Sequence, residues 1–566
     1  MSMLNIGTSA LLTTQGALTT TSHNISNVNT EGYSRQRVVQ GTTPPNFSGG
    51  QYIGSGVKIT SIERLFDKFL ADQLRQFTSQ EQNFKIFGTY AKQVDDMLGS
   101  PQLSIASGME SFFNAMQEVA DDPTSIPARQ VLLTEADSLA RRFNTLNNQF
   151  DSINRLLNQN LEATVQDINT ISQGIRELNQ TILDAGSSVP NDLLDQRDRL
   201  INDLSKLVSV QAVQQSNGSI NIFVGNGQGL VVGSTLNELT TAVDPADATR
   251  LDIVFGSSGT LVTNQIVGGT MGGLLTVRSD IIDPARAEID ELAANIAEVL
   301  NQQHSTGLTL NGAAGGNLFA IPDPLPADWP AGAAAAIAVA IADPRDLAVA
   351  FPVAVTTNSL NSGSGGLTIA SIDGSDPAFD AGNALAGPLS FSFNQATNEY
   401  TVNYNGNTAT LNYNPAIDSG RSFDLSELTF APSDEPPPLT ITLTGVPADG
   451  DSFVVNNSTG AAGDNRNALA MAELQVQKVL DGGTRSFADA YGNLVASVAT
   501  KTRQAGLSQV TQQGLMEQTQ ARLEAVSGVN LDEEAANLIK YQQSYQAAAQ
   551  IITVSRTIFD TLLNAF

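Results

Sequence analysis

The side chains best suited to acid–base or metal chemistry are few in this chain of 566 residues. It has two histidines, His23 and His304, and no cysteine. Neither histidine lies in an H-E-x-x-H pattern, and no thiolate is available, so the sequence predicts no zinc site. We expect His23 to be a solvated or interfacial imidazole on the polar flank of a first helix. We expect His304 to be structural, a cation at the C-terminal end of a helix.

Paired carboxylates and one glycine-rich run are the other candidates for chemistry. Adjacent acidic residues occur at 95–96, 121–122 and 533–534, but neighbours on a helix point about 100° apart, which does not make a catalytic pair. The run Val224–Gly229 is followed by an apparent strand, whereas a phosphate-binding loop requires a helix. A β turn is expected there. The sequence therefore predicts no catalytic residue, no cofactor, no metal and no enzymatic activity.

The charge of the chain limits its partners. Its formal net charge is −28, which disfavours nucleic acid and anionic membrane surfaces. No apolar run has the length of a membrane span. Arg35 is the first basic residue, so the N-terminus lacks the pattern of a cleaved secretory signal. We expect a protein without nucleic-acid or membrane partners, which is cytoplasmic or exported without a cleaved signal.

Apolar residues at both ends of the chain recur every seven positions, which places each set along one face of a helix. The two sets are Leu4, Leu11, Leu18 and Ile25, and Leu531, Leu538, Tyr545, Ile552, Phe559 and Phe566. A chain with an apolar stripe at each end is suited to joining the two ends to each other or to neighbouring copies. These ten residues are the predicted assembly interface.

Helical patterns fill most of the remaining chain. The first helix is predicted over residues 3–27, and the last opens at Asn530, with Glu533 placed for a capping box. Between them we expect helices near 62–98, from 127 to about 182 with a coiled-coil-like seam, over 192–207, over 273–303 with a break at Pro284, and, with breaks, from 464 to about 526. Short strands are expected within 208–272.

A long acidic segment interrupts the helical pattern. Residues 306–462 contain 15 acidic and two basic residues. Alternating residues flank Asn405-Gly406, a strong hairpin signal, and further strands are expected at 389–393 and 439–443. We therefore predict a multidomain, mainly α fold: a long coiled-coil-like helical bundle with paired terminal helices and an inserted, mostly β domain. Its nested, discontinuous domains are 1–60 with 526–566, 61–305 with 463–525, and the outward-facing insertion 306–462.

The two termini resemble the signatures of bacterial flagellar axial proteins, the family of rod, hook and hook-associated proteins. The N-terminal match is carried by Asn24, Ile25, Ser26, Asn27, Asn29, Thr30, Gly32 and Tyr33. The C-terminal match runs from Val529 to Ile552. Internal segments at 191–210, 301–312 and 463–475 resemble the hook-associated protein 1 branch of that family.

The resemblance implies a structural role in the junction layer between hook and filament. It also implies flagellar type III export and an extracellular location in the flagellum. The implied partners are further copies in a ring or helical layer, the hook protein, a second junction protein and the filament. A dedicated export chaperone would bind the C-terminal region. Two alternatives remain open from the sequence: a secreted adhesin that uses residues 306–462, and a hydrolase lodged in that insertion.

Overall fold

A computed structural model describes residues 2–48, 50–186, 189–322, 325–374, 380–433, 436–458 and 462–564. The chain forms two compact units, each assembled from separated segments. Unit 1 comprises Met1–Lys92, Asn154–Asp280 and Lys501–Phe566, and unit 2 comprises Gln93–Ile153 and Ile281–Thr500. The fold is mainly helical with a separate β-rich region, as predicted.

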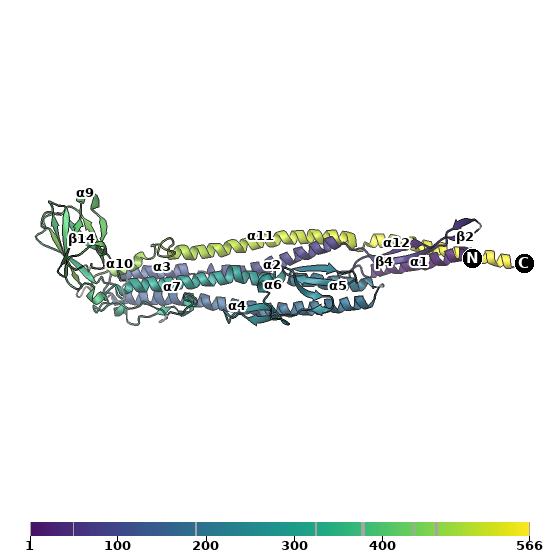
Figure 1. The fold of residues 1–566 in the computed structure, drawn as a ribbon, viewed down its shortest axis with the longest axis horizontal. Helices are drawn as coiled ribbons and strands as arrows, with labels where there is room; N and C mark the ends of the chain where they lie inside the picture. Colours follow the sequence, from purple (N-terminus) through teal and green to yellow (C-terminus); the bar gives the residue numbers. More distant parts are fainter. Residues whose placement is uncertain are drawn as a thin grey trace. The chain divides into compact units, whose positions relative to one another are not determined.

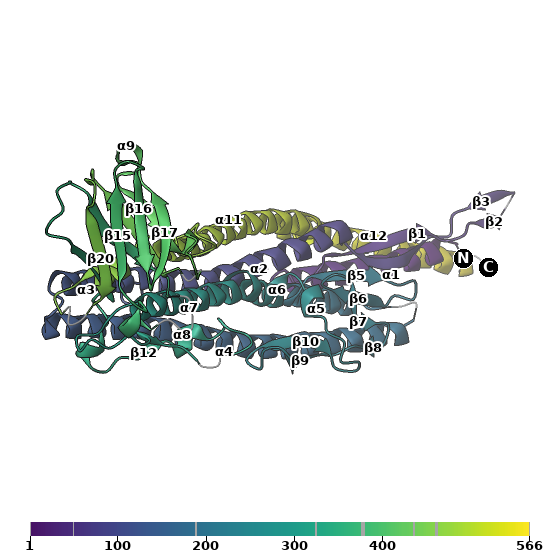
Figure 2. The same ribbon diagram turned by 60° about the vertical axis from the view of Figure 1, so that its left-hand side comes forward.

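Unit 1 brings the two ends of the chain together. Helix α1 (Ser2–Ser26) lies beside helix α12 (Leu531–Leu563), as Figures 1 and 2 both show. Strands β1 (Gln36–Thr42) and β4 (Val57–Arg64) form an antiparallel ribbon that also contacts α1. The chain between them folds into a small hairpin of β2 (Asn46–Ser48) and β3 (Gln51–Ile53).

The prediction of a helix from Ile62 was wrong at its start. Ile62 pairs with Val38 in the β1–β4 ribbon, and α2 begins only at Lys68. The apolar spacing around Ile62 fits either structure, and pairing with a distant strand decided the outcome.

The remaining elements of unit 1 confirm the predicted helices and strands. They are parts of α2 (Lys68–Leu98), α4 (Ile126–Asp184) and α11 (Phe487–Ser527), with α5 (Asn191–Leu207) and α6 (Gly269–Val277). A four-stranded sheet holds β5 (Val210–Gln214), β6 (Ile220–Val224), β7 (Gln228–Val232) and β8 (Thr235–Leu236). Strands β9 (Leu239–Val243) and β10 (Leu251–Phe255) pair separately, and η1 (Thr263–Gln265) precedes α6. Residues 225–227 turn between β6 and β7, as expected.

The helices of unit 2 include α3 (Ile105–Asp121), α7 (Asp283–Ser305), α8 (Ala333–Ala336) and α10 (Arg466–Glu473). The predicted break near Pro284 is confirmed: a π-helical segment, η2 (Arg278–Ile282), precedes α7, and Pro284 lies in the first turn of that helix. Strands β11 (Phe319–Ala320) and β12 (Ala338–Val339) pair next to α7, and η3 (Pro344–Asp346) follows.

The β-rich region of unit 2 is a sandwich of two sheets (Figure 2). The larger sheet has the order β13-β20-β15-β16-β17 and the smaller β14-β19-β18. The strands are β13 (Val353–Thr357), β14 (Gly366–Ile372), β15 (Leu389–Asn394), β16 (Glu399–Tyr404), β17 (Asn407–Asn412), β18 (Arg421–Asp424), β19 (Leu439–Thr444) and β20 (Ser452–Asn457). Short helices η4 (Ala381–Asn383), α9 (Pro415–Asp418) and η5 (Leu425–Glu427) connect them.

The predicted hairpin in this region is confirmed in its turn as well as its strands. Asn405 and Gly406 join β16 to β17 with φ values of 50° and 81°. Positive φ at both turn residues is the conformation that matches the twist of a two-residue hairpin. The sandwich core is built from residues between Phe351 and Val455 only.

His304 is structural, but the expectation that it is a cation was wrong. The imidazole is fully buried, its Nδ1 donates to the carbonyl oxygen of Gly316 at 2.7 Å, and its Nε2 accepts from the Ala348 N–H at 2.8 Å. Burial lowers the pKa of His304 to about 4. One donating and one accepting nitrogen define a neutral ring.

Candidate assembly site at the paired chain ends

The two terminal helices pair antiparallel. Near one end, the Asn24 Nδ2 donates to the Glu534 carboxylate at 3.1 Å. Near the other, Gly7 faces Ile552 so closely that an added Cβ would lie 2.8 Å from the Ile552 Cγ1. The absence of a side chain at Gly7 is therefore what allows α12 to approach this turn of α1.

The predicted stripe residues divide into two groups. Leu11, Leu18, Ile25, Leu538, Tyr545 and Ile552 are half-buried, whereas Leu4, Leu531 and Phe559 are exposed. Phe566 lies outside the described residues. The most deeply buried apolar positions of the pair are small residues, Ala17 and Ala548. Small side chains let two helix backbones approach closely, so the larger stripe residues flank the contact rather than fill it.

The exposure of Phe559 follows from the register of the pair. Asn24 lies opposite Glu534 and Gly7 opposite Ile552, so α12 continues beyond the start of α1. Phe559 and Leu563, each 63% exposed, lie in that overhang. Most of their apolar surface is not covered by the described residues of the chain.

Asn24 of the N-terminal signature is the centre of a buried hydrogen-bond network. Its Oδ1 accepts from the Gln36 N–H at 2.9 Å and from the Tyr33 hydroxyl at 2.7 Å. Its Nδ2 donates to the Gln36 carbonyl oxygen at 2.9 Å and to Glu534. The side chain is 1% exposed, and all its hydrogen-bonding capacity is used. It therefore joins α1, the start of β1 and α12 at one point.

Arg35 carries this network to the start of the last helix. Its guanidinium pairs with Glu533 at 2.5 Å and with Glu534 at 2.7 Å, while its backbone N–H donates to the Ser527 carbonyl oxygen at 2.8 Å. Glu534 is 2% exposed. One residue thus connects the end of α11 to the first turn of α12.

The N-terminus of α12 is capped differently from a full capping box. The Asn530 Oδ1 accepts from the N–H groups of Asp532 and Glu533, as predicted. The carboxylate of Glu533 accepts from Arg35 and not from the Asn530 backbone. The stronger charge-assisted bond determines where this side chain points.

The rest of the signature shapes the turn after α1. Asn27 accepts from the Thr30 hydroxyl at 3.1 Å, and Gly32 has a φ of 73° that other residues rarely adopt.

The Tyr33 hydroxyl lies 3.1 Å from the His23 Nδ1. His23 is half-buried, and its Nε2 lies 3.7 Å from a carboxylate oxygen of Asp192. Burial, reinforced by Asp192, Asp195 and Glu534, raises the pKa of Tyr33, so its hydroxyl stays protonated. Ser26 and Asn29 are exposed.

Sequence reasoning missed a second charged cluster beside the signature. Asp195 of α5 accepts from the Ser34 N–H at 3.0 Å and from Arg64 at 2.9 Å. Asp198 forms an ion pair with Arg64 at 2.6 Å and accepts a hydrogen bond from Arg75 at 3.0 Å. The three-residue spacing of the two aspartates on a helix placed them on one face, but their partners on β4 and α2 were not readable from the sequence.

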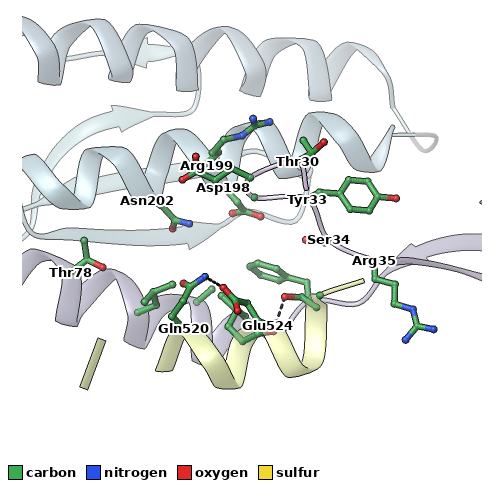
Figure 3. A pocket seen from close by; sticks show the side chains of 18 of the residues that line it. Thr30, Tyr33, Ser34, Arg35, Thr78, Asp198, Arg199, Asn202, Gln520 and Glu524 are labelled. Atoms are coloured by element: carbon green, nitrogen blue, oxygen red, sulfur yellow. Dashed lines mark hydrogen bonds between the residues drawn. The ribbon is translucent and has the colours of Figure 1, made fainter. Parts of the chain in front are cut away.

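A cavity of about 1020 Å³ opens among these elements. It is lined by the turn after α1, by α2 and α5, and by the end of α11. Figure 3 shows Asp198 and Asn202 of α5 across from Gln520 and Glu524 of α11, with Tyr33, Ser34 and Arg35 at one end. Polar and charged side chains dominate the lining.

Neither a metal centre nor a membrane span is seen in the part of the chain that the structure describes. The described residues contain no group of three or more histidine, cysteine or acidic side chains that could hold a metal ion. Among them, no helix combines the length and apolar character required to cross a bilayer.

Known proteins match this chain over its whole length. A profile of the flagellar hook-associated protein FlgK helical domain matches residues 91–319. Profiles of the flagella basal body rod protein and of the flagellar basal body rod FlgEFG protein C-terminal match residues 4–33 and 520–565. Flagellar hook-associated protein 1 of Escherichia coli strain K12 is 31% identical, with 100% of this chain and 99% of that protein covered. This chain belongs to the flagellar hook-associated protein 1 family.

More distant members agree with the assignment. The Bacillus subtilis strain 168 protein is 25% identical, with 98% of this chain covered and 96% of that protein. The structure of the flagellar hook junction protein FlgK from Burkholderia pseudomallei superposes with a TM-score of 0.69 at 26% identity, covering 81% of this chain and 100% of that one. The prediction of a hook-associated structural protein of the bacterial flagellum is confirmed. The comparisons give the adhesin alternative no support.

Proposed function

We propose that copies of this protein form the layer that joins hook to filament, and that the α1–α12 pair is the part through which they assemble. One observation carries the proposal: α12 has two apolar faces, of which α1 covers one. The other face holds Ala547, Val554 and Ile558, spaced by seven and four residues and all exposed. A helix that is apolar on opposite sides is suited to a position between two neighbours.

The energetics favour assembly over an isolated helix pair. Most of the stability of a helix in a protein comes from packing of its apolar face. Two helices whose contact is narrow and made by small residues therefore gain little stability from pairing with each other alone. Each large apolar side chain covered by a neighbouring copy contributes about 1.5–3 kcal/mol. Exposed residues of the pair, such as Leu12, Ile539 and Val554, provide that surface. Assembly would therefore order both ends of the chain.

The chain is proposed to divide by role into three nested parts. Residues 1–60 and 526–566 form the axial core of the layer. Residues 61–305 and 463–525 form a rigid, coiled-coil-like spacer, supported by the buried apolar positions that recur along α4 at Leu139, Leu146 and Ile153. The acidic insertion 306–462 faces solvent, because its sandwich has a core of its own and its negative charge favours hydration.

The proposed partners follow from the position of the layer. Copies meet head to tail around the tube axis, because a repeated contact between two different patches generates a ring or a helix. Hook protein lies on one side of the layer, and a second junction protein followed by the filament lies on the other. Nucleic acid and membrane surfaces are not partners, given the net charge of −28.

The route to this position is proposed to be flagellar type III export. The first 30 residues lack Lys, Arg, Asp and Glu. A dedicated chaperone would cover the C-terminal region from about residue 525, where α12 exposes Ile539, Val554 and Phe559. Exposed apolar surface of this kind requires protection before assembly.

Leu538→Asp tests the assembly role. Leu538 is half-buried beside α1, so a carboxylate there should abolish incorporation at the hook tip while the circular dichroism of the purified chain stays helical. Gln546→Asp, on an exposed position of the same helix, should incorporate normally. Electron microscopy of flagella and a motility assay measure both. Normal motility of the Leu538→Asp strain would contradict the proposal.

A further inference from the structure

The small hairpin between β1 and β4 carries two aromatic side chains that the described residues leave largely exposed. Phe47 is 66% exposed and Tyr52 75% exposed, and their ring centroids lie 5.0 Å apart. Ile53 beside them is 48% exposed. We define Phe47, Tyr52 and Ile53 as the hairpin tip. Two strands of three residues each are marginally stable on their own, so this tip is suited to being held by a partner.

The hairpin tip is also free of charge. From Val38 to Val57 the chain contains no Asp, Glu, Lys or Arg. In a protein with a net charge of −28, copies repel one another over most of their surfaces. Neighbouring copies can therefore come into contact most readily where both partners are uncharged.

A matching uncharged surface lies on the last helix of the same unit. Residues 541–555 of α12 contain no Asp, Glu, Lys or Arg. Exposed Ala547 and Val554 lie on the side of α12 away from the half-buried Tyr545 and Ile552, and exposed Ile558 continues this outer face just beyond the uncharged stretch. The hairpin and this stretch of α12 lie at the same end of unit 1 (Figures 1 and 2).

We propose that the hairpin tip of one copy packs against the outer face of α12 in the next copy. The inference rests on the proposed function, which supplies adjacent copies, and it names the surfaces that meet. Both surfaces are exposed in the single chain, so they do not cover each other within one molecule. Because the two patches differ, the contact is heterologous and can be repeated from copy to copy around the layer.

Cross-linking between introduced cysteines tests the contact, because the natural chain has no cysteine. The double variant Tyr52→Cys with Val554→Cys is expressed in a deletion strain, and intact flagella are treated with a short bismaleimide. Dimers and longer multimers on a denaturing gel are expected. Two single-cysteine chains expressed together should give dimers only, which establishes that the bond is between copies.

Matched controls decide the outcome. Tyr52→Cys with Gln546→Cys, whose second cysteine is on another exposed side of α12, should give no multimers. If the first double variant is not incorporated, Phe47→Cys with Ile558→Cys replaces it. Junctions that form normally yet yield no cross-link with either pair would overturn the hairpin contact and leave the proposed function standing. Failure of the proposed function would appear separately, as normal incorporation of Leu538→Asp.

A charge substitution provides a second readout. Phe47→Asp with Tyr52→Asp should lower retention of the protein at the hook tip by about tenfold or more, since each buried aromatic side chain contributes that much to association. Phe47→Leu with Tyr52→Phe should keep wild-type retention. Retention is measured by immunoblotting of sheared flagella and of the medium. Wild-type retention of the aspartate variant would contradict the contact.

Discussion

At the scale of single residues, adjacent side chains of the same type have different environments. Glu533 and Glu534 both pair with Arg35, but their side chains are 59% and 2% exposed. Glu534 also accepts from Asn24. Removal of a buried partner leaves the remaining groups unsatisfied, whereas removal of an exposed one does not.

We predict that Glu534→Ala lowers the local free energy of opening at the start of α12 by about 2–3 kcal/mol, because Arg35 and Asn24 lose a buried acceptor. Glu533→Ala should lower it by at most about 1 kcal/mol, the value of an exposed ion pair. Native-state amide exchange of residues 534–538 measures both. Equal effects of the two substitutions would show that the buried network does not hold this helix end.

His304 should make the stability of unit 2 dependent on pH. Its pKa is about 4 in the folded chain, against 6.5 for an unperturbed imidazole. As the pH falls from 6.5 to 4, the unfolded chain binds a proton that the folded chain does not, so stability decreases by about 3 kcal/mol. The contribution of the neutral ring to stability is fully present above pH 6.5.

Denaturant unfolding between pH 7 and pH 4 measures how the free energy of unfolding changes with pH. His304→Gln should be less stable at pH 7 and should lose the histidine part of the pH dependence. His23→Gln should keep it, because His304 and the backbone groups that it bonds are unchanged in that variant. An unchanged slope in His304→Gln would mean that carboxylates cause the whole effect.

At the scale of elements, α12 changes character along its length. Its first turns are tied to Arg35 and Asn24, its middle packs on α1 at Ala548, and its last turns run beyond α1. Stability should decrease along the helix in the same order, because packing on a partner is what stabilises a helix in water.

Amide exchange on the purified chain should show this gradient. We expect the fastest exchange after Ile552, intermediate rates in α1 and in the middle of α12, and the slowest rates in α4, where apolar residues such as Leu139 and Leu157 are fully buried. Assembly into flagella should slow exchange at both ends. If α12 exchanges as slowly as α4 in the free chain, the apolar faces of the terminal helices are already covered within one molecule.

At the scale of the whole molecule, the chain enters and leaves the β sandwich on two neighbouring strands. Strands β13 and β20 are neighbours, and the Ser458 N–H donates to the Pro352 carbonyl oxygen at 2.7 Å. The core of the sandwich comes from its own residues. If the sandwich is removed, Pro352 and Ser458 can therefore be connected by a short linker.

Removal of residues 353–457, with a short Gly-Ser linker in their place, should leave a protein that folds and still joins filament to hook. The terminal helices that are proposed to assemble are unchanged in this variant. Electron microscopy of flagella and a motility assay provide the measurement. Hooks without filaments, from a deletion variant that is secreted and helical, would show that the insertion is required for the junction.

The sequence by itself determined the local structure and the family of this protein. Seven-residue apolar spacing is enough to specify the helices at both ends, and Asn405-Gly406 is enough to specify a hairpin turn, because each depends on neighbours within a few residues. The signature around Asn24 and Tyr33 identified the family. None of these inferences required knowledge of contacts between distant segments.

Only the tertiary structure decided which surfaces are covered and which remain open. Ile62 lies in a strand because Val38 pairs with it, His304 is neutral because Gly316 and Ala348 enclose it, and Glu533 turns to Arg35 instead of closing its own helix cap. In α12, the pairing with α1 covers one apolar face and leaves Val554 and Ile558 exposed. Periodicity reports that a helix has apolar faces, but the partner of each face depends on segments hundreds of residues away.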